Sequence, residues 1–292
     1  MPPEEQAAGV RRVTWAGMAI NIGLAALKMA GGILGQSAAV VADAVHSISD
    51  VATDLAILIG VRFWSKPPDE CHPHGHRRIE TVVTIVIGLS LAAVAIGLGY
   101  RSMASIGEPH GPPGLVALLA AGLSIVVKEA LFRWTLIVGR RIRSTAVVAN
   151  AWHHRSDAYS SVPAFIAVGG ALLVPGWQWL DHLGAILVAL FILHAAIRIM
   201  KPAYEELIDT GASDAEVAEL ARLAEGVAGV REVHGLRTRY HGGGLHVDLH
   251  VLVDPGLSVR EGHDIGGAVK HRLLRDGPHV ADVLVHLEPY EG

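Results

Sequence analysis

Six apolar stretches of membrane-spanning length constrain the fold of this chain more than any other feature. A helix that crosses a bilayer needs about 20 consecutive, mostly apolar residues. Hydrophobic residues make up 51% of the 292 residues and charged residues only 18%, a composition typical of integral membrane proteins. We therefore expect a six-helix transmembrane domain over residues 13–203. The six stretches are Val13–Leu34, Ala38–Phe63, Ile79–Ile106, Leu115–Val138, Ala146–Val174 and Leu180–Met200.

The basic residues between these stretches predict the orientation of the chain. Loops that carry Lys and Arg face the cytoplasm, and six crossings place nearly all of them on one side; Arg101 is the exception. Both termini are then cytoplasmic, residues 1–12 form a cytoplasmic N-terminal segment, and the protein is a multi-pass protein of the cytoplasmic (inner) membrane. The residues that fix this orientation are Arg11, Arg12, Lys66, Arg77, Arg78, Arg140, Arg141, Arg143, Arg198 and Lys201.

Three further features limit the class of protein. The first twelve residues, MPPEEQAAGVRR, lack the apolar region of a cleavable signal peptide. The single cysteine, Cys71, excludes an intramolecular disulfide. The formal net charge of -4 gives no indication of nucleic-acid binding, so we expect no nucleic-acid partner.

From about Tyr204 the composition becomes that of a soluble domain, so we expect a separate cytoplasmic domain over residues 204–292. Its pattern predicts the order α-β-β-α-β, a small ferredoxin-like α/β sheet with both helices on one face. The expected elements are helix Asp214–Glu225, strands Val230–Tyr240 and Leu245–Val253, helix Val259–Leu274 and strand Val280–Leu287.

Two His-x3-Asp pairs lie inside apolar stretches. His46 and Asp50 lie in the second stretch, and His153 and Asp157 lie in the fifth. On a helix, residues four apart share a face, so each pair presents an imidazole and a carboxylate together. An ionisable group inside a membrane helix costs about 2.5–3.5 kcal/mol and usually marks an ion path. Together the pairs supply four ligands, enough for a tetrahedral divalent metal.

A structural interpretation of these groups competes with the metal site: they cap helix ends or pair with Lys28, Lys128 or Arg155. Asp43 and Asp54 extend the first pair, and they either line an access route or lie near helix ends. Helical spacing selects His153 rather than His154 as the partner of Asp157, with Asn150 a possible polar neighbour. Lys128 and Glu129 in the fourth stretch are either structural partners of nearby charges or part of a proton relay. All these residues lie in or next to the apolar stretches.

These motifs resemble the cation diffusion facilitator family. The resemblance is carried by Ser37, Asp43, His46 and Asp50, by the loop DECHPHGHRRIE and by NAWHHRSD. Six spans followed by a cytoplasmic α/β domain match the family plan over essentially the whole chain. The resemblance implies a homodimer in the lipid bilayer that exports divalent transition metals in exchange for protons. It also implies a transport site between the second and fifth helices, of the zinc type because its ligands are His and Asp.

The same resemblance implies two further metal sites and one charge contact. In the loop after the second span it assigns Asp69, His72 and His76, with Cys71 and His74 as extra possible ligands; the alternative is a solvated polar loop. Arg78 and Asp209 resemble the family's charge interlock between the membrane and cytoplasmic parts. In the cytoplasmic domain the alternative is a solvated sheet face, and the implied ligands are His234, His250, His263, His286 and Glu288.

The ligand chemistry agrees with this function. Imidazole with carboxylate suits Zn²⁺, as substrate and as regulatory ligand, and accepts Fe²⁺, Co²⁺ or Cd²⁺. Only neutral His binds metal, so His46 and His153 can exchange metal for protons. We expect no enzyme, because H-E-x-x-H is absent and four protein ligands leave no open position. The remaining alternative is a membrane metal sensor or scaffold of the same fold that does not transport.

Overall fold

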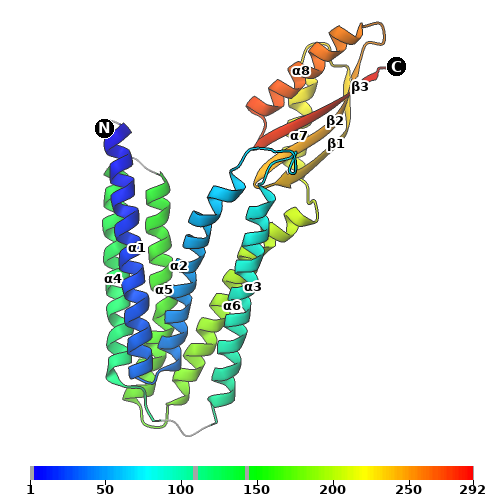
Figure 1. Ribbon diagram of the computed structural model, residues 1–292. Helices are drawn as coiled ribbons and strands as arrows, with labels where there is room; N and C mark the ends of the chain where they lie inside the picture. The colour runs from blue at the N-terminus through cyan, green and yellow to red at the C-terminus, as the bar shows by residue number, and fades with distance from the viewer. Residues whose placement is uncertain (1–2, 108–110, 142–144, 292) are drawn as a thin grey trace. The chain divides into compact units, whose positions relative to one another are not determined.

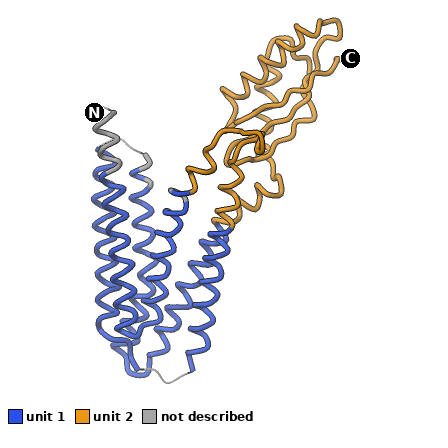
Figure 2. Tube along the Cα trace, viewed as in Figure 1, with its two compact units in different colours: residues 1–59, 86–198 blue, residues 60–85, 199–292 orange. Residues whose placement is uncertain are grey.

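The computed structural model describes residues 3–107, 111–141 and 145–291. Six long helices are followed by the order α7-β1-β2-α8-β3 (Figure 1), which confirms the predicted fold class. The chain forms two compact units, one of residues 1–59 and 86–198 and the other of residues 60–85 and 199–292 (Figure 2). Helices α2, α3 and α6 therefore contribute residues to both units.

The long helices correspond to the six predicted stretches. Four of them (α1 from Arg12, α3, α4 and α6) are long and apolar enough to cross a membrane when the described residues are searched. The other two, α2 and α5, have 27 and 29 residues and carry the His-x3-Asp pairs. Helix α1 begins earlier than predicted, at Pro3: proline suits the first turn of a helix, and the good helix formers that follow, Glu4, Glu5, Gln6, Ala7 and Ala8, outweigh the cost of Gly9. The helices are α1 Pro3–Leu34, α2 Ala38–Trp64, α3 Arg78–Ser105, α4 Leu115–Arg141, α5 Thr145–Leu173 and α6 Trp179–Leu207.

The core of the helical unit consists mainly of alanine and valine. Small side chains let helices approach closely, which is how helices associate in a membrane, where the hydrophobic effect gives no attraction between them. In Figure 1, α1, α4 and α5 run alongside one another. The central buried cluster comprises Ala39, Val40, Ala42, Ala95, Ala117, Ala121, Ala164, Ala167, Val168, Ala185, Val188 and Ile192.

Asp181, in the first turn of α6, caps the N-terminus of α2. Its carboxylate accepts hydrogen bonds from the Ser37 hydroxyl at 2.6 Å and from the backbone N–H groups of Ala38 at 2.6 Å and Ala39 at 3.3 Å. A carboxylate at a helix N-terminus satisfies free N–H groups and opposes the helix dipole. This cap fixes the start of α2, two turns before His46.

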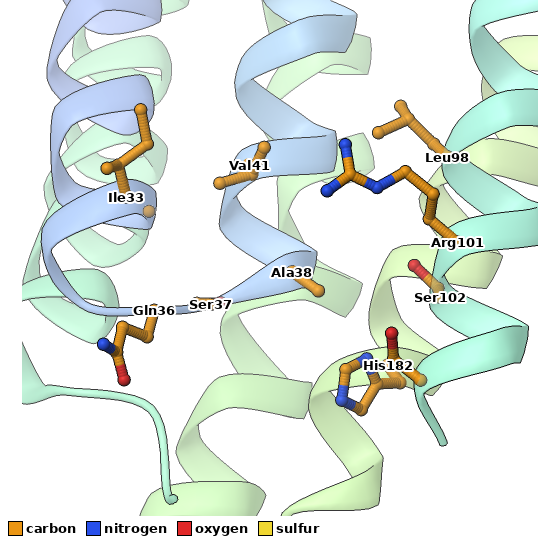
Figure 3. A pocket seen from close by; sticks show the side chains of 11 residues that line it. Ile33, Gln36, Ser37, Ala38, Val41, Leu98, Arg101, Ser102 and His182 are labelled. Carbon is orange, nitrogen blue, oxygen red and sulfur yellow. The ribbon is translucent and has the colours of Figure 1, made fainter. Parts of the chain in front are cut away.

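A cavity of about 280 Å³ opens beside this capped end (Figure 3). Its lining includes Gln36, Ser37, Arg101, Ser102 and His182. Arg101 extends from α3 toward α2 (Figure 3), where Val41 lines the same cavity. Arg101, the one basic residue that departs from the predicted charge asymmetry, therefore lines this cavity. The cavity lies at the N-terminal end of α2, before the His46–Asp50 pair.

The sheet of the second unit has the order β1-β2-β3. Strands β1 (Glu232–His241) and β2 (Gly244–Val253) are antiparallel, and β3 (Val280–Pro289) pairs parallel with β2. Helix α8 (Val259–Asp276) provides the crossover that a parallel pair requires. Alternation along β2 buries one face against α7 (Asp214–Glu225) and α8. The opposite face of β2 carries His246, Asp248 and His250.

Candidate metal sites

Helix α2 presents His46 and Asp50 as a pair. Nδ1 of His46 lies 3.8 Å from Oδ1 of Asp50, so the two side chains share a face as their spacing predicts. Oδ2 of Asp50 is buried and has no hydrogen-bond partner among the described residues. A buried carboxylate oxygen without a partner is costly, which makes Asp50 an acceptor open to a cation.

Helix α5 presents the second pair in a different setting. Nδ1 of His153 lies 3.7 Å from Oδ1 of Asp157, and the His153 side chain is 55% exposed whereas Asp157 is buried. The other oxygen of Asp157, Oδ2, lies 3.5 Å from Nζ of Lys128 on α4. An ammonium group therefore neutralises Asp157 in this structure, as the structural interpretation of these residues allowed.

The adjacent His154 has another environment. It is buried, and its Nε2 lies 3.3 Å from Nδ2 of Asn150. A side chain added at Gly17 on α1 would meet Nε2 of His154 at 3.3 Å. His154 thus packs toward α1, while His153 keeps the face that Asp157 shares.

The two pairs interact with each other at a distance. Asp50 interacts electrostatically with Asp157, Lys128 and His153 as well as with His46. Zinc ligands lie about 2.0–2.2 Å from the ion, and among the described residues no three of these four groups have ligand atoms within 4.8 Å of one another. The structure forms each pair but does not gather all four ligands around one point.

Asp43 has a fully buried partner that helical spacing alone does not identify. Nζ of Lys28 on α1 lies 3.0 Å from Oδ2 of Asp43 and 2.5 Å from the hydroxyl of Ser47. The hydroxyl of Ser161 on α5 donates to Oδ1 of Asp43 at 2.9 Å. Asp43 therefore connects α1, α2 and α5. The side chain of Asp54 lies outside the described residues.

Glu129 lies beside arginines. Nε of Arg133 is 2.8 Å from one of its carboxylate oxygens, and Nε of Arg155 is 3.8 Å from the other. Glu129 thus forms a structural ion pair, whereas its neighbour Lys128 contacts a candidate ligand.

The loop between α2 and α3 gathers three candidate ligands. Oδ1 of Asp69 lies 3.0 Å from Nδ1 of His72, and Oδ2 lies 3.2 Å from Nε2 of His76. Desolvation by itself would raise the pKa of Asp69. Hydrogen bonds from the backbone and ring of His72 nevertheless hold this pKa below its usual value. The carboxylate is thus ionised and placed between two imidazoles, in a group that could hold a metal ion. Cys71 is exposed beside it.

The helix-free face of the sheet gathers a second group. Nε2 of His234 lies 2.9 Å and Nδ1 of His250 lies 2.7 Å from the carboxylate of Glu288. The hydrogen bond from His234 is the main reason that the pKa of Glu288 is lowered. These three residues could also hold a metal ion. The His286 ring centroid lies 4.7 Å from that of His250, so His286 adjoins the group.

Local backbone geometry explains how His234 reaches this group. The β1–β2 register shifts between His234 and Arg237, and Gly235 between them has φ of +58°. A β-bulge re-aims the side chains beside it, and glycine adopts positive φ without strain. A Cβ at position 235 would meet the His250 ring at 3.2 Å. His263, by contrast, lies on α8, which covers the other face of the sheet, so within one chain it does not join this group.

Arg78 and Asp209 lie together, with Nη2 to Oδ1 at 3.3 Å, and both are exposed. The more buried contact nearby involves Glu206, which sequence reasoning missed. One of its oxygens, Oε1, accepts from the Thr81 hydroxyl at 2.7 Å and from the backbone N–H of Gly242 at 2.8 Å. Glu206 thereby joins the ends of α3 and α6 to the β1–β2 turn.

Comparison with known proteins identifies this arrangement. A family model described as the cation efflux transmembrane domain matches residues 14–208, and one described as the cation efflux protein cytoplasmic domain, ZT_dimer, matches residues 212–290. The manganese efflux system protein MneP of Bacillus subtilis is 30% identical over 285 residues, with 96% of each chain covered. The magnetosome protein MamB of Magnetospira sp. is 34% identical over 278 residues, covering 95% of this chain and 94% of that protein.

Two further similarities are partial. Metal tolerance protein C1 of Arabidopsis thaliana is 33% identical over 289 residues, and the chain spans 61% of its length. A solved variant of the MamM CTD is 32% identical, covers 27% of this chain and 98% of its own, and has a TM-score of 0.26. The transmembrane match covers most of the chain, and the alignment with MneP covers 96% of it. The chain therefore belongs to the cation diffusion facilitator family, whose members are multi-pass membrane transporters of divalent metal ions.

Proposed function

We propose that this protein exports Zn²⁺ from the cytoplasm in exchange for protons, and that His46, Asp50, His153 and Asp157 bind the ion during transport. The observation that carries the proposal is the pair of His-x3-Asp faces on α2 and α5, which are near enough for Asp50 to interact electrostatically with Asp157 and His153. A movement of one helix relative to the other would have to bring the four ligands to coordination distance. Such movements are what alternating access requires.

Lys128 supplies the charge that metal must replace. With its ammonium 3.5 Å from Asp157, the site without metal is partly neutralised. An arriving dication is repelled by this ammonium and attracted by the two carboxylates. Metal and the Lys128 ammonium therefore compete for Asp157, so Lys128 limits how tightly the transported ion is held.

The two histidines of the site couple metal binding to protonation. A neutral imidazole binds metal and an imidazolium does not. Protonation of His46 and His153 releases the ion, and metal binding releases protons. This competition couples metal movement to proton movement in the opposite direction.

The donor set favours zinc over manganese as the substrate. Imidazole nitrogen suits Zn²⁺ and also Fe²⁺, Co²⁺ or Cd²⁺, whereas Mn²⁺ prefers oxygen ligands. Because a relative is named for manganese efflux, Zn²⁺ and Mn²⁺ must be compared directly. Reconstituted in vesicles with an imposed pH gradient, the native chain should move Zn²⁺ faster than Mn²⁺, Fe²⁺, Co²⁺ or Cd²⁺.

Asp157→Asn is the decisive variant for that assay, and Asp264→Asn on the exposed surface of α8 is its matched control. Loss of flux in Asp157→Asn alone supports the membrane site. Faster flux of a different metal corrects the substrate and keeps the site. No flux of any metal, with metal still bound by the purified native chain, favours a sensor or scaffold of this fold and overturns the proposal.

We also propose the surrounding organisation. Residues 13–203 cross the cytoplasmic membrane six times, both termini are cytoplasmic, and residues 204–292 mediate a homodimer, which the ZT_dimer match supports. Cys71 offers a test, because it is the only cysteine and is exposed. A membrane-impermeant maleimide should label it in inverted vesicles and not in intact cells. Light scattering of the purified chain should give the mass of a dimer.

The loop group (Asp69, His72, His76) and the sheet group (His234, His250, Glu288) are proposed as regulatory sites. His286 completes the sheet group, and His263 would join it only from a second copy of the chain. Metal bound on the sheet would stabilise one arrangement of the cytoplasmic domain and so bias transport. Substituting His250 should then change the metal concentration at which flux begins, with the maximal rate retained.

A further inference from the structure

Three histidines near the β1–β2 turn belong to neither group described above. His241 ends β1, His246 lies on β2, and His74 lies in the α2–α3 loop. Across the hairpin His246 pairs with Arg239, so His241, two residues further on, shares a sheet face with His246. Their ring centroids are 5.2 Å apart.

His241 is held in place and has an unused ring nitrogen. It is 8% exposed, and its Nδ1 has no hydrogen-bond partner among the described residues. The neighbouring Gly242 has φ of +56°, and a Cβ there would collide with Cβ of Arg77. The turn is therefore packed against the start of α3, and the hydrogen bond from Gly242 to Glu206 fixes it further. A buried imidazole nitrogen without a hydrogen-bond partner is free to bind a metal ion.

Two cavities meet at these histidines. One of about 580 Å³ and another of about 430 Å³ share Pro73, His74, His241 and His246 in their linings. His74 interacts electrostatically with both His241 and His246. The same space is therefore lined by a loop histidine and two sheet histidines, and because the ligand atoms of the three do not all lie within 4.8 Å of one another in the described residues, a bound ion would have to draw the loop closer to the sheet.

The charges around the three histidines leave room for a cation. Arg78 is paired with Asp209, and Arg239 is paired with Asp248. The other charged side chains that line the cavities or interact with the histidines are Lys66, Arg77, Glu80, Glu206 and Asp282. Asp282 is paired with Lys270, which leaves two basic and two acidic side chains.

We propose that His74, His241 and His246 form a separate transition-metal site that joins the α2–α3 loop to the β1–β2 turn. Three imidazoles select borderline metals such as Zn²⁺, Co²⁺ or Ni²⁺ over Mn²⁺ and Mg²⁺. Burial lowers the pKa of both His241 and His246, which keeps these rings neutral and able to bind. The ligands of this site differ from those of the loop and sheet groups, although His72 of the loop group lines one of the two cavities, and its occupancy does not depend on which ion is transported.

The test is the number of Co²⁺ ions bound per chain by the full-length protein in detergent, measured by visible absorption against a competing chelator. His246→Gln and His74→Gln are each expected to lose one ion per chain. His271→Gln, which removes an exposed histidine on α8, should lose none. An unchanged count in His246→Gln overturns the proposal. A loss in His74→Gln alone also overturns it, because His74 would then belong with Asp69, His72 and His76.

A second measurement needs no variant and covers the case in which substitution disturbs folding. Diethyl pyrocarbonate labels accessible neutral histidines, and mass spectrometry locates the label. Saturating Zn²⁺ should abolish labelling of His246 in the native chain and leave labelling of His271 unchanged. Equal labelling of His246 with and without Zn²⁺ would overturn the proposal. Because both measurements are made at equilibrium without vesicles, they are independent of the flux assay for transport.

Discussion

The buried ion pair between Lys28 and Asp43 gives a quantitative prediction. Both side chains are 0% exposed, and Nζ lies 3.0 Å from Oδ2. Ser47 and Ser161 occupy further hydrogen-bonding positions of the pair. Asp43→Asn preserves the shape of the side chain and its acceptor oxygen, but it leaves the Lys28 ammonium without a counter-charge inside the helix bundle.

The magnitude follows from the cost of an unpaired buried charge. Removing one partner of a buried pair destabilises a protein by about 3–5 kcal/mol, while replacing both by neutral groups is often nearly neutral. We therefore expect Asp43→Asn and Lys28→Met each to lose roughly 3–5 kcal/mol and the double variant to lose much less than their sum. A loss of this size is a large part of the stability of about 5–15 kcal/mol typical of folded proteins.

The assay is unfolding of the full chain in detergent, followed by tryptophan fluorescence for the two single variants and the double variant. Lys270→Met with Asp282→Asn is the matched control, because that pair lies 2.9 Å apart on the surface and should contribute little. The reasoning is refuted if Asp43→Asn unfolds like the native chain, or if the double variant loses the sum of the two single losses.

Three further predictions concern other parts of the chain. Lys128→Gln should lower the metal concentration for half-maximal uptake by about tenfold, because it removes a positive charge 3.5 Å from Asp157; an unchanged concentration would contradict competition between ammonium and metal. Asp181→Ala should cost about 1–2 kcal/mol in unfolding experiments through loss of the α2 cap, and an unaltered unfolding midpoint would show that the cap is dispensable. Hydrogen bonds from the hydroxyl and backbone of Ser258 lower the pKa of Glu261 below 4.5. This stabilisation is present above that value and lost as pH falls through the lower folded pKa, so acid unfolding of the cytoplasmic domain should lose part of its pH dependence in Glu261→Gln. An acid profile that stays the same in this variant would exclude Glu261 as a contributor.

Periodicity in the sequence predicted much of this fold. Apolar length predicted the six long helices, and the spacing of His46 and Asp50 predicted that they share a face. Alternation in the tail predicted the order α-β-β-α-β and the face of β2 that carries His250. These inferences succeed because helix and strand periods decide which residues share a face. The family resemblance drawn from the same motifs was confirmed by the matches over both domains.

Contacts between distant segments were harder to predict. Spacing gives the face of a helix but not the partner on another helix, so the Asp181 cap on α2 and the Glu206 contacts of Thr81 and Gly242 had no local signal. Lys28 was named only as one of several possible partners. The bulge that turns His234 toward Glu288 depends on Gly235, whose positive φ is visible only in the structure.

The most direct test of the account is simultaneous measurement of Zn²⁺ and proton movement in the same vesicles, with one fluorescent indicator for each. The native chain should move the two ions in opposite directions, and collapse of the pH gradient should slow both. Asp50→Asn should abolish both movements, and Asp264→Asn should change neither. Zn²⁺ movement without proton movement, or undiminished exchange in Asp50→Asn, would contradict proton-coupled transport at the α2–α5 site.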